Sequence, residues 1–376
     1  MSRIASYGTL AVLAVAVALA PADLLAQGCT GSTLEAPGGV FDPEGQSYFL
    51  KKGAWQTSFG MRGFRSHRHF VGSVEQSAEN VANGTAESDR SGSEVINHSY
   101  IGGLAVSYGL SDRWSVSADI PWVYYIRKSP GRGVRPQGRT EASGLGDVRL
   151  SAQYWLLDPA ASGSGNVQVG LGFKLPTGDD RVEDDHITNS TNPDGSFVFQ
   201  RRPVDFSIMP GDGGWGIIAS AQGFRSFGRF TAFASGSYLF SPQEQNDYLR
   251  NPTATNPNPT SAYYTIADQY VARVGVATAI RKLGLSLSAR VEGVPSSDII
   301  GGDMGRRRPG YSIGIEPGLS YNLGGTALSL SVPILVRRVR NQNVSDRLES
   351  IETGEFHVGD AAFADYVVIG SISRRF

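Results

Sequence analysis

The sequence contains three groups of side chains that could do chemistry. His98 precedes Ser99, and a hydrolase on the outer face of a membrane protein would need a His and a Ser together. His67 and His69 are spaced to share a metal ion, although two ligands alone make a weak site. An acidic run could hold Ca²⁺ or the bridging cations of a lipopolysaccharide layer, and it consists of Asp179, Asp180, Glu183, Asp184 and Asp185.

The His98–Ser99 pair and the acidic run each have a simpler interpretation, which we favour. His98 belongs to an apolar stripe of alternating residues. In a β-barrel this would place His98 at the outer rim, beside a Ser99 that faces the barrel interior. The acidic run lies in a long polar segment typical of a solvated loop. The chain has no phosphate-binding loop and no dinucleotide fingerprint between a strand and a helix. The sequence therefore predicts that the protein is not an enzyme and has no cofactor and no metal site.

The composition indicates an all-β chain. Its 376 residues include 47 Gly, 17 Phe, 15 Tyr and 5 Trp, with 18% charged residues and a net charge of −1. The single Cys excludes a disulfide framework within the chain and a Cys-cluster metal site. A net charge near zero gives no electrostatic reason to bind nucleic acid. The mean hydropathy of −0.18 excludes a polytopic helical membrane protein.

The N-terminus predicts export from a bacterial cytoplasm. Arg3 precedes the apolar run LAVLAVAVALA at 10–20, which is too short to span a bilayer. We expect a signal peptide over 1–26, cleaved after Ala26. Cys29 leaves lipidation open as an alternative, although Gln27 fits a lipidation signal poorly. Residues 27–52 are expected to form a flexible periplasmic segment or a small plug.

Alternation with a period of two predicts a transmembrane barrel over 53–376. In the clearest segment, Leu285, Leu287 and Ala289 alternate with polar neighbours. Long polar connections alternate with tight turns, as in an outer-membrane barrel with long outer loops and short periplasmic turns. The alternative is a secreted β-sandwich, which has no reason to alternate its loop lengths. We predict an antiparallel up-and-down barrel of about twelve strands, at 53–65, 95–109, 113–127, 146–157, 166–177, 214–225, 230–241, 265–281, 285–295, 310–323, 326–340 and 363–376.

The ends of the strands support this location. Aromatic residues such as Trp55 and Trp122 stand at opposite ends of the apolar stripes, like two interfacial girdles. The chain ends in Phe376, on the same parity as Ile372 and Val368, which looks like the signal read by the outer-membrane insertion machinery. We therefore expect the protein in the bacterial outer membrane, in contact with lipid and lipopolysaccharide.

The polar parity of the strands must face the barrel interior. These charges either form ion pairs that brace a narrow barrel, which we favour, or make a polar conduit with a preference for anions. The predicted lumen-lining residues are Arg62, Asp119, Asp147, Arg149, Lys174, Arg273, Arg290, Glu292, Glu316 and Arg337.

Several motifs resemble the outer-membrane β-barrel family named for the meta-cleavage pathway of phenol degradation. They are SHRHFVG at 66–72, YGLSDRW at 108–114 with Ile120-Pro121 beyond it, GLGDVR at 144–149, KLPTG at 174–178 and MPG at 209–211. The resemblance implies a transporter-like barrel and the uptake of aromatic or hydrophobic compounds. It carries over no substrate residues, but Asp147 and Lys174 are the charged motif positions at strand ends.

The sequence thus predicts a channel for the passive passage of small solutes, with aromatic or hydrophobic compounds as the implied class. The alternative is a closed structural or adhesive barrel that acts through its long outer loops. An outer-membrane hydrolase that uses His98 and Ser99 is the third hypothesis.

Overall fold

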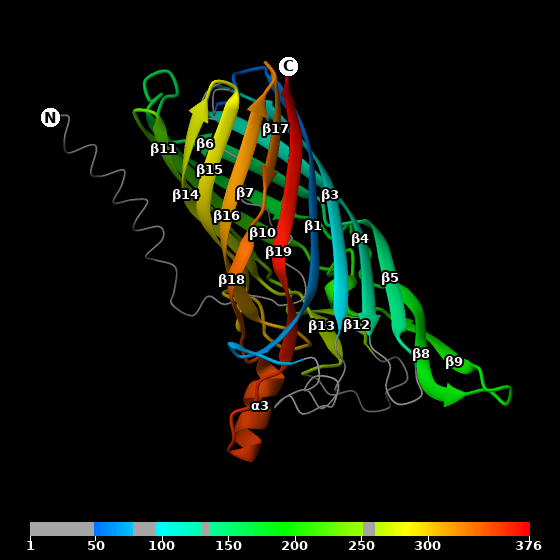
Figure 1. Cartoon of the computed structure of the whole chain (residues 1–376). Coiled ribbons are helices and arrows are strands. Elements are labelled where there is room, and N and C mark those ends of the chain that lie inside the picture. Colours follow the sequence, from blue (N-terminus) through cyan, green and yellow to red (C-terminus); the bar gives the residue numbers. More distant parts are fainter. Residues whose placement is uncertain (1–48, 78–94, 130–135, 251–259) are drawn as a thin grey trace.

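The computed structural model describes residues 49–77, 95–129, 136–250 and 260–376 (Figure 1). The predicted signal peptide, Cys29 and most of the segment 27–52 lie outside the described residues. No helix in the described part of the chain has the length and apolar character needed to cross a membrane.

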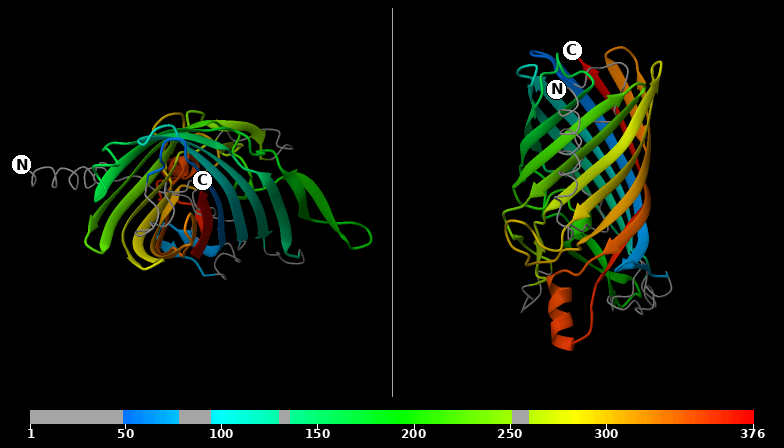
Figure 2. Two further views of the ribbon diagram at one scale, coloured as in Figure 1. Left: turned by 90° about the horizontal axis from the view of Figure 1, so that it is seen from above. Right: turned by 90° about the vertical axis from the view of Figure 1, so that its left-hand side faces the viewer.

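The described chain forms a closed antiparallel barrel of twelve strands, as predicted. The first and last strands pair and close the wall, for example at Gln56 opposite Arg375. The strands are steeply tilted, as Figure 2 shows. They are β1 (Trp55–Val71), β3 (Ile96–Gly109), β4 (Trp114–Ser129), β5 (Gly138–Leu145) with β6 (Arg149–Trp155), β7 (Gly165–Lys174), β10 (Gly216–Phe227), β11 (Phe230–Phe240), β14 (Gln269–Ile280), β15 (Leu283–Val294), β16 (Gly310–Asn322), β17 (Thr326–Ser331) with β18 (Ile334–Arg340), and β19 (Asp360–Arg375).

Two of these strands are interrupted. Pro333, which cannot donate a backbone hydrogen bond, separates β17 from β18. Gly146, Asp147 and Val148 separate β5 from β6, and both pieces pair with β4. On the other side, β7 pairs with β6 but not with β5. The wall is therefore interrupted beside β5, at the end of the barrel that carries the long loops.

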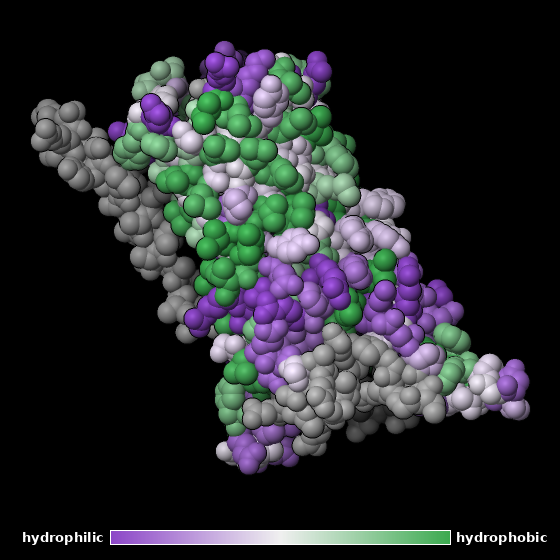
Figure 3. All heavy atoms as spheres, viewed as in Figure 1, coloured by the Kyte–Doolittle hydropathy of each residue, from purple (hydrophilic) through white to green (hydrophobic). Residues whose placement is uncertain are grey.

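The outer surface of the barrel is apolar, as the alternation predicted. Phe59, Leu171 and Val274 are each at least half exposed, whereas Ser235 and Glu316 on the opposite parity are buried. Figure 3 shows one face, with hydrophobic residues over the wall and hydrophilic residues toward the loop end. An exposed apolar wall of this kind is stable in lipid and not in water. This is the fold of a bacterial outer-membrane barrel.

A β-bulge corrects one of the predicted lumen residues. Between β16 and β18 the register shifts at Ile313 and Gly314, so that one extra residue is accommodated in β18. The parity of the strand reverses at this point. Arg337 is therefore exposed on the outer face, with its guanidinium 5.9 Å from the centre of the Tyr311 ring. Arg338 and Arg340 are buried in its place.

The long loops carry additional structure at the end of the barrel opposite the C-terminus (Figure 1). The short strand β2 (Val74–Glu75) extends β1 into a hairpin. The helix α3 (Val344–Thr353) has a capping box at Asn343 and is capped by Gly354, whose φ is +74°. The remaining elements are β8 (Glu183–Thr191), β9 (Phe197–Pro203), the 3₁₀ turn η1 (Phe206–Ile208), β12 (Gln245–Leu249) and β13 (Tyr263–Thr265).

Candidate functional site

A chain of buried ion pairs crosses the barrel interior. Arg62 donates to Glu292 at 2.7 Å, and Arg290 donates to the other oxygen of Glu292 at 2.9 Å. Glu316 continues the chain, because it lies 3.6 Å from Arg290 and accepts from Arg273 at 3.1 Å. All five side chains are buried. Half of the predicted lumen residues therefore meet in a single network.

The link between Arg62 and Glu292 spans the lumen. Arg62 lies on β1 and Glu292 on β15, and these strands are separated around the wall by β16, β17 with β18, and β19. A contact between them must pass through the interior of the barrel. The network therefore braces the barrel from within the lumen.

A second cluster stands at the wall interruption. The Lys174 Nζ, at the end of β7, donates to Asp147 at 2.8 Å, to the Gly214 carbonyl at 2.6 Å and to Asp212. Asp147 also accepts from the backbone N–H of Gly178 at 3.0 Å. The cluster ties the break between β5 and β6 to the segment that precedes β10. The two motif positions Asp147 and Lys174 are therefore direct partners.

Two glycines of the quoted motifs meet beside this cluster. A Cβ added at Gly178 would lie 2.7 Å from the Gly211 Cα, and one added at Gly211 would lie 2.4 Å from the Gly178 carbonyl oxygen. The backbones cross here with no room for a side chain at either position. This crossing directs the segment between β9 and β10, residues 204–215, into the mouth of the barrel. We call residues 204–215 the inward segment.

The inward segment forms an apolar core inside the mouth. Val204 and Ile208 are fully buried there and pack with Val123 and Tyr125 of β4. A cavity of about 100 Å³ remains beneath the segment. It borders the wall interruption at Gly146 and Asp147, and its lining includes Phe206, Met209, Pro210 and Tyr264.

A partly buried carboxylate fixes the inward segment. Asp205 accepts two hydrogen bonds from Arg308, at 2.8 and 3.0 Å, and its carboxylate lies 3.5 Å from Arg127. Burial alone would raise the pKa of Asp205, but the two guanidinium groups hold it well below its usual range. Asp205 therefore stays ionised and links the inward segment to two other parts of the mouth.

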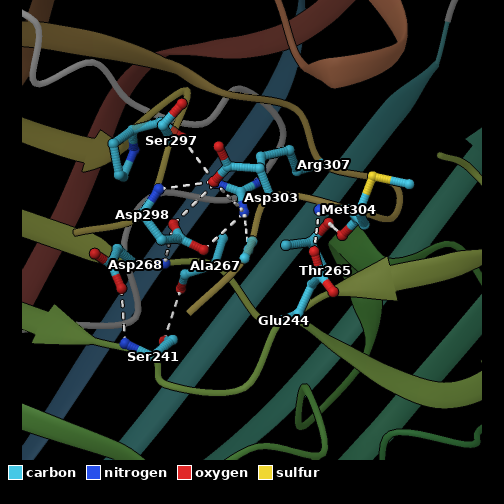
Figure 4. A network of polar contacts seen from close by, with 12 residues as sticks. Ser241, Glu244, Thr265, Ala267, Asp268, Ser297, Asp298, Asp303, Met304 and Arg307 are labelled. Atoms are coloured by element: carbon cyan, nitrogen blue, oxygen red, sulfur yellow. Dashed lines mark hydrogen bonds and ion pairs between the residues drawn. The ribbon is translucent and has the colours of Figure 1, made fainter. Parts of the chain in front are cut away.

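A third network holds the loop between β15 and β16, as Figure 4 shows. Arg307 donates to both oxygens of Asp298, at 2.8 and 2.7 Å, and both side chains are fully buried. Asp298 also accepts from the backbone N–H of Asp268, and Asp268 accepts from Ser241. Burial raises the pKa of Asp298 to about 6, and it raises the pKa of Asp268 as well.

The opposite end of the lumen contains an aromatic cluster. The Phe49 ring lies 4.7 Å from the Trp155 ring and 6.2 Å from the Phe224 ring, measured between centroids. The Phe49 segment is held because Gly53 donates to the Gly109 carbonyl at 2.8 Å. A Cβ at Gly109 would lie 2.1 Å from the Lys51 carbonyl oxygen, so this position requires glycine. Phe49 thus packs against the inner wall near the short turns.

The remaining predicted lumen residues lie on the wall. Asp119 and Arg149 are opposite each other in the pairing of β4 with β6. The outward position of Arg337 has been described above. Sequence patterning did not identify the arginines and aspartates of the loops, such as Asp205, Asp298 and Arg307. They lie in segments without periodicity, so parity could not assign them to a face.

The side chains first considered for chemistry are engaged elsewhere or kept apart. His98 and Ser99 are neighbours on β3, so their side chains point to opposite faces and do not form a couple. His69 contacts Asp360 at 2.5 Å and His67 lies 3.5 Å from Asp365, so each has its own carboxylate. In the acidic run, Asp184 accepts from the Glu141 N–H, and Glu183 accepts from Tyr248. Within the described ranges, no cluster of three or more His, Cys, Asp or Glu side chains is arranged to hold a metal ion.

Comparison with known proteins finds a similar fold but no similar sequence. No known family model matches the chain, and no curated protein matches its sequence. An outer membrane channel from Pseudomonas putida F1 has a similar crystal structure, with a TM-score of 0.53 and 12% identity over 87% of this chain and 97% of that chain.

Two other solved structures align at lower scores. The translocator domain of the autotransporter NalP from Neisseria meningitidis has a TM-score of 0.42 and 11% identity, over 86% of this chain and 89% of that one. The P. putida toluene transporter TodX also has a TM-score of 0.42, with 10% identity, over 86% of this chain and 90% of that one. The likeness to the P. putida F1 channel shows a shared barrel architecture.

Proposed function

We propose that this protein is an outer-membrane channel for the passive passage of small hydrophobic solutes, aromatic compounds among them. The observation that carries the proposal is the cavity under the inward segment. Its lining includes Val123, Tyr125, Phe206 and Met209, which offer an apolar solute a site at the outer end of the barrel. The shared architecture with an outer membrane channel agrees with a transport role.

The position of the ion-pair network favours a path on which a hydrophobic solute leaves the axis of the barrel. An apolar molecule on the axis would have to separate buried pairs such as Arg62 and Glu292 without replacing their hydrogen bonds, which is unfavourable. The cavity instead borders the wall interruption at Gly146 and Asp147. We propose that the solute passes from the cavity toward lipid at this interruption.

Reconstitution tests the proposal. Purified protein in planar bilayers should give discrete conductance steps, and cells that carry the gene should take up a radiolabelled aromatic hydrocarbon faster than otherwise identical cells that lack it. A closed structural or adhesive barrel would give neither signal. The absence of both conductance and accelerated uptake would overturn the channel proposal.

The resemblance to the phenol meta-cleavage family remains a prediction, as do the signal peptide and the role of Phe376 in insertion. We propose that the family resemblance is meaningful because its motif residues are structural neighbours here. Asp147 contacts Lys174, and Gly178 contacts Gly211. A survey of related sequences aligned at these four positions would test whether the four residues vary together.

A further inference from the structure

A row of basic side chains crosses the outer surface of the barrel at its loop end. Arg65 of β1 stands opposite His98 of β3, and Lys128 of β4 stands opposite Arg139 of β5. His98 and Lys128 are diagonal neighbours in the pairing of β3 with β4, because His98 lies opposite Ile126. The row therefore spans four adjacent strands, or about 14 Å at the usual spacing between strands. We call Arg65, His98, Lys128 and Arg139 the outer basic row.

The outer basic row lies on the lipid-facing side of the wall. Arg65 is exposed and continues the outward stripe that holds Phe59 and Met61. Ser66 and Asn97, on the opposite parity of β1 and β3, are buried. In Figure 3, hydrophilic residues lie over the loop ends of β3, β4 and β5, beyond the hydrophobic wall. The cations of the row are therefore directed away from the lumen.

An aromatic belt adjoins the row on the side of the apolar wall. The Tyr100 and Tyr124 rings stack with 6.2 Å between their centroids, and Trp122 is exposed in the same outward stripe of β4. Tyr100 is two residues from His98 on β3, so the row is the next outward level beyond the belt. Tyr and Trp side chains of this kind lie at the level of the lipid headgroups. The row therefore stands among the headgroups of the outer leaflet.

Two cations of the row lack an acidic partner in the described part of the chain. Neither Arg65 nor Lys128 forms an ion pair with any residue that the structure describes. Arg139 differs, because it donates to Glu141 at 2.5 Å. Glu141 also accepts from the Tyr124 hydroxyl at 2.7 Å, so this carboxylate is already satisfied by two donors.

The acids next along the wall are engaged as well. Arg68 donates to Glu75 at 2.6 Å and to Asp365 at 2.9 Å, and Asp365 also lies 3.5 Å from His67. The row itself behaves as one electrostatic site, because the charges of Lys128, Arg65 and Arg139 all act on His98. An anion placed over the row would meet an excess of positive charge.

We propose that the outer basic row binds the phosphorylated glycolipid of the outer leaflet, lipopolysaccharide, with its phosphate groups on Arg65 and Lys128. The guanidinium of Arg65 can bind a phosphate through two parallel hydrogen bonds, and Lys128 binds it as a point charge. The phosphate is carried by a lipid because the row borders the apolar wall, where acyl chains can lie along Tyr100 and Trp122. This site is separate from the lumen and does not depend on the passage of a solute.

Native mass spectrometry of the purified full chain in detergent tests the site. Titration with diphosphoryl lipid A counts the bound glycolipid, and EDTA removes divalent cations that could bridge phosphates to carboxylates. We expect lipid A without its phosphates to bind about tenfold more weakly. The double variant Arg65→Gln/Lys128→Gln should bind diphosphoryl lipid A about 25-fold more weakly, at about fivefold for each cation. The exchange Arg65→Lys/Lys128→Arg should retain binding.

The matched control is the double variant Arg229→Gln/Lys282→Gln. It removes the same two charges from exposed short turns at the opposite end of the barrel, so binding should be unchanged. Each variant is first shown to be folded by the heat-modifiable gel shift of the wild type.

Four results would overturn the proposal. The first is equal binding of lipid A with and without its phosphates, and the second is undiminished binding by the folded Arg65→Gln/Lys128→Gln protein. If inorganic phosphate displaces lipid A, the row takes a free phosphate and the lipid assignment fails. If phosphatidylglycerol binds as tightly as diphosphoryl lipid A, the row accepts any anionic lipid and the glycolipid assignment fails.

Discussion

Arg62 on β1 donates a hydrogen bond of 2.7 Å to Glu292 on β15, across the lumen and over 230 positions of sequence. Neither side chain is open to solvent. A buried ion pair adds little net stability relative to well-packed apolar residues, but loss of one partner leaves a buried charge unpaired. The two ends of this pair are not equivalent, because Glu292 also accepts from Arg290.

This asymmetry predicts unequal effects of substitution. Glu292→Gln removes the shared acceptor of two arginines and should lower the free energy of unfolding by about 3–5 kcal/mol. Arg62→Met leaves Glu292 paired with Arg290 and should lower it by less. Urea unfolding in detergent, followed by tryptophan fluorescence, measures both changes against the exposed control Glu355→Gln. Equal losses in the two variants would contradict the shared-acceptor geometry.

Lys174 should be the most sensitive lysine of the described wall. Lys174→Met leaves Asp147 and Asp212 side by side without their cation, which should destabilise the protein by about 3 kcal/mol. The control is Lys282→Met, in the exposed turn between β14 and β15. The temperature at which each variant loses its compact form on a heat-modifiable gel gives the comparison. The cluster would have no stabilising role if the two variants lost that form at the same temperature.

Phe49 should restrict the inner end of the lumen. Phe49→Ala removes the ring that packs on Trp155 and Phe224, so ion conductance in planar bilayers should rise severalfold. Phe199→Ala, on the exposed β9 strand, should leave conductance unchanged. A Phe49→Ala channel with wild-type conductance would show that this ring does not obstruct the path of ions.

Asp298 should make the stability of the outer loops depend on pH. Its pKa of about 6 in the folded protein lies above the value of about 3.9 in an unfolded chain, so the folded state binds more protons in between. The added stability is present in full below about pH 4 and is lost as the pH rises through 6. The thermal midpoint should therefore fall between pH 5 and pH 7.5, and it should fall less in Asp298→Asn. Asp247→Asn is the exposed control, and a wild-type midpoint that rises over this interval would refute the prediction.

The barrel could be predicted from the alternation of residues along the chain. Apolar and polar residues alternate along each strand because one face meets lipid, so parity gave the number of strands, their approximate bounds and the inward charges such as Arg290 and Glu316. Arg337 was placed on the wrong face because a single bulged residue reverses parity, and alternation alone does not locate a bulge.

The contents of the barrel mouth could not be predicted in this way, because they depend on tertiary contacts. The segments that carry Asp205, Asp298 and Arg306 have no period, and their positions follow from contacts between loops distant in sequence. Asp205 meets Arg308 over 103 positions, and Gly178 meets Gly211 because neither has a side chain at the crossing. The alternation of residues along a strand indicates which of its faces meets lipid and which meets the barrel interior. The pairing of these loop charges depends on contacts that form only when the whole barrel has closed.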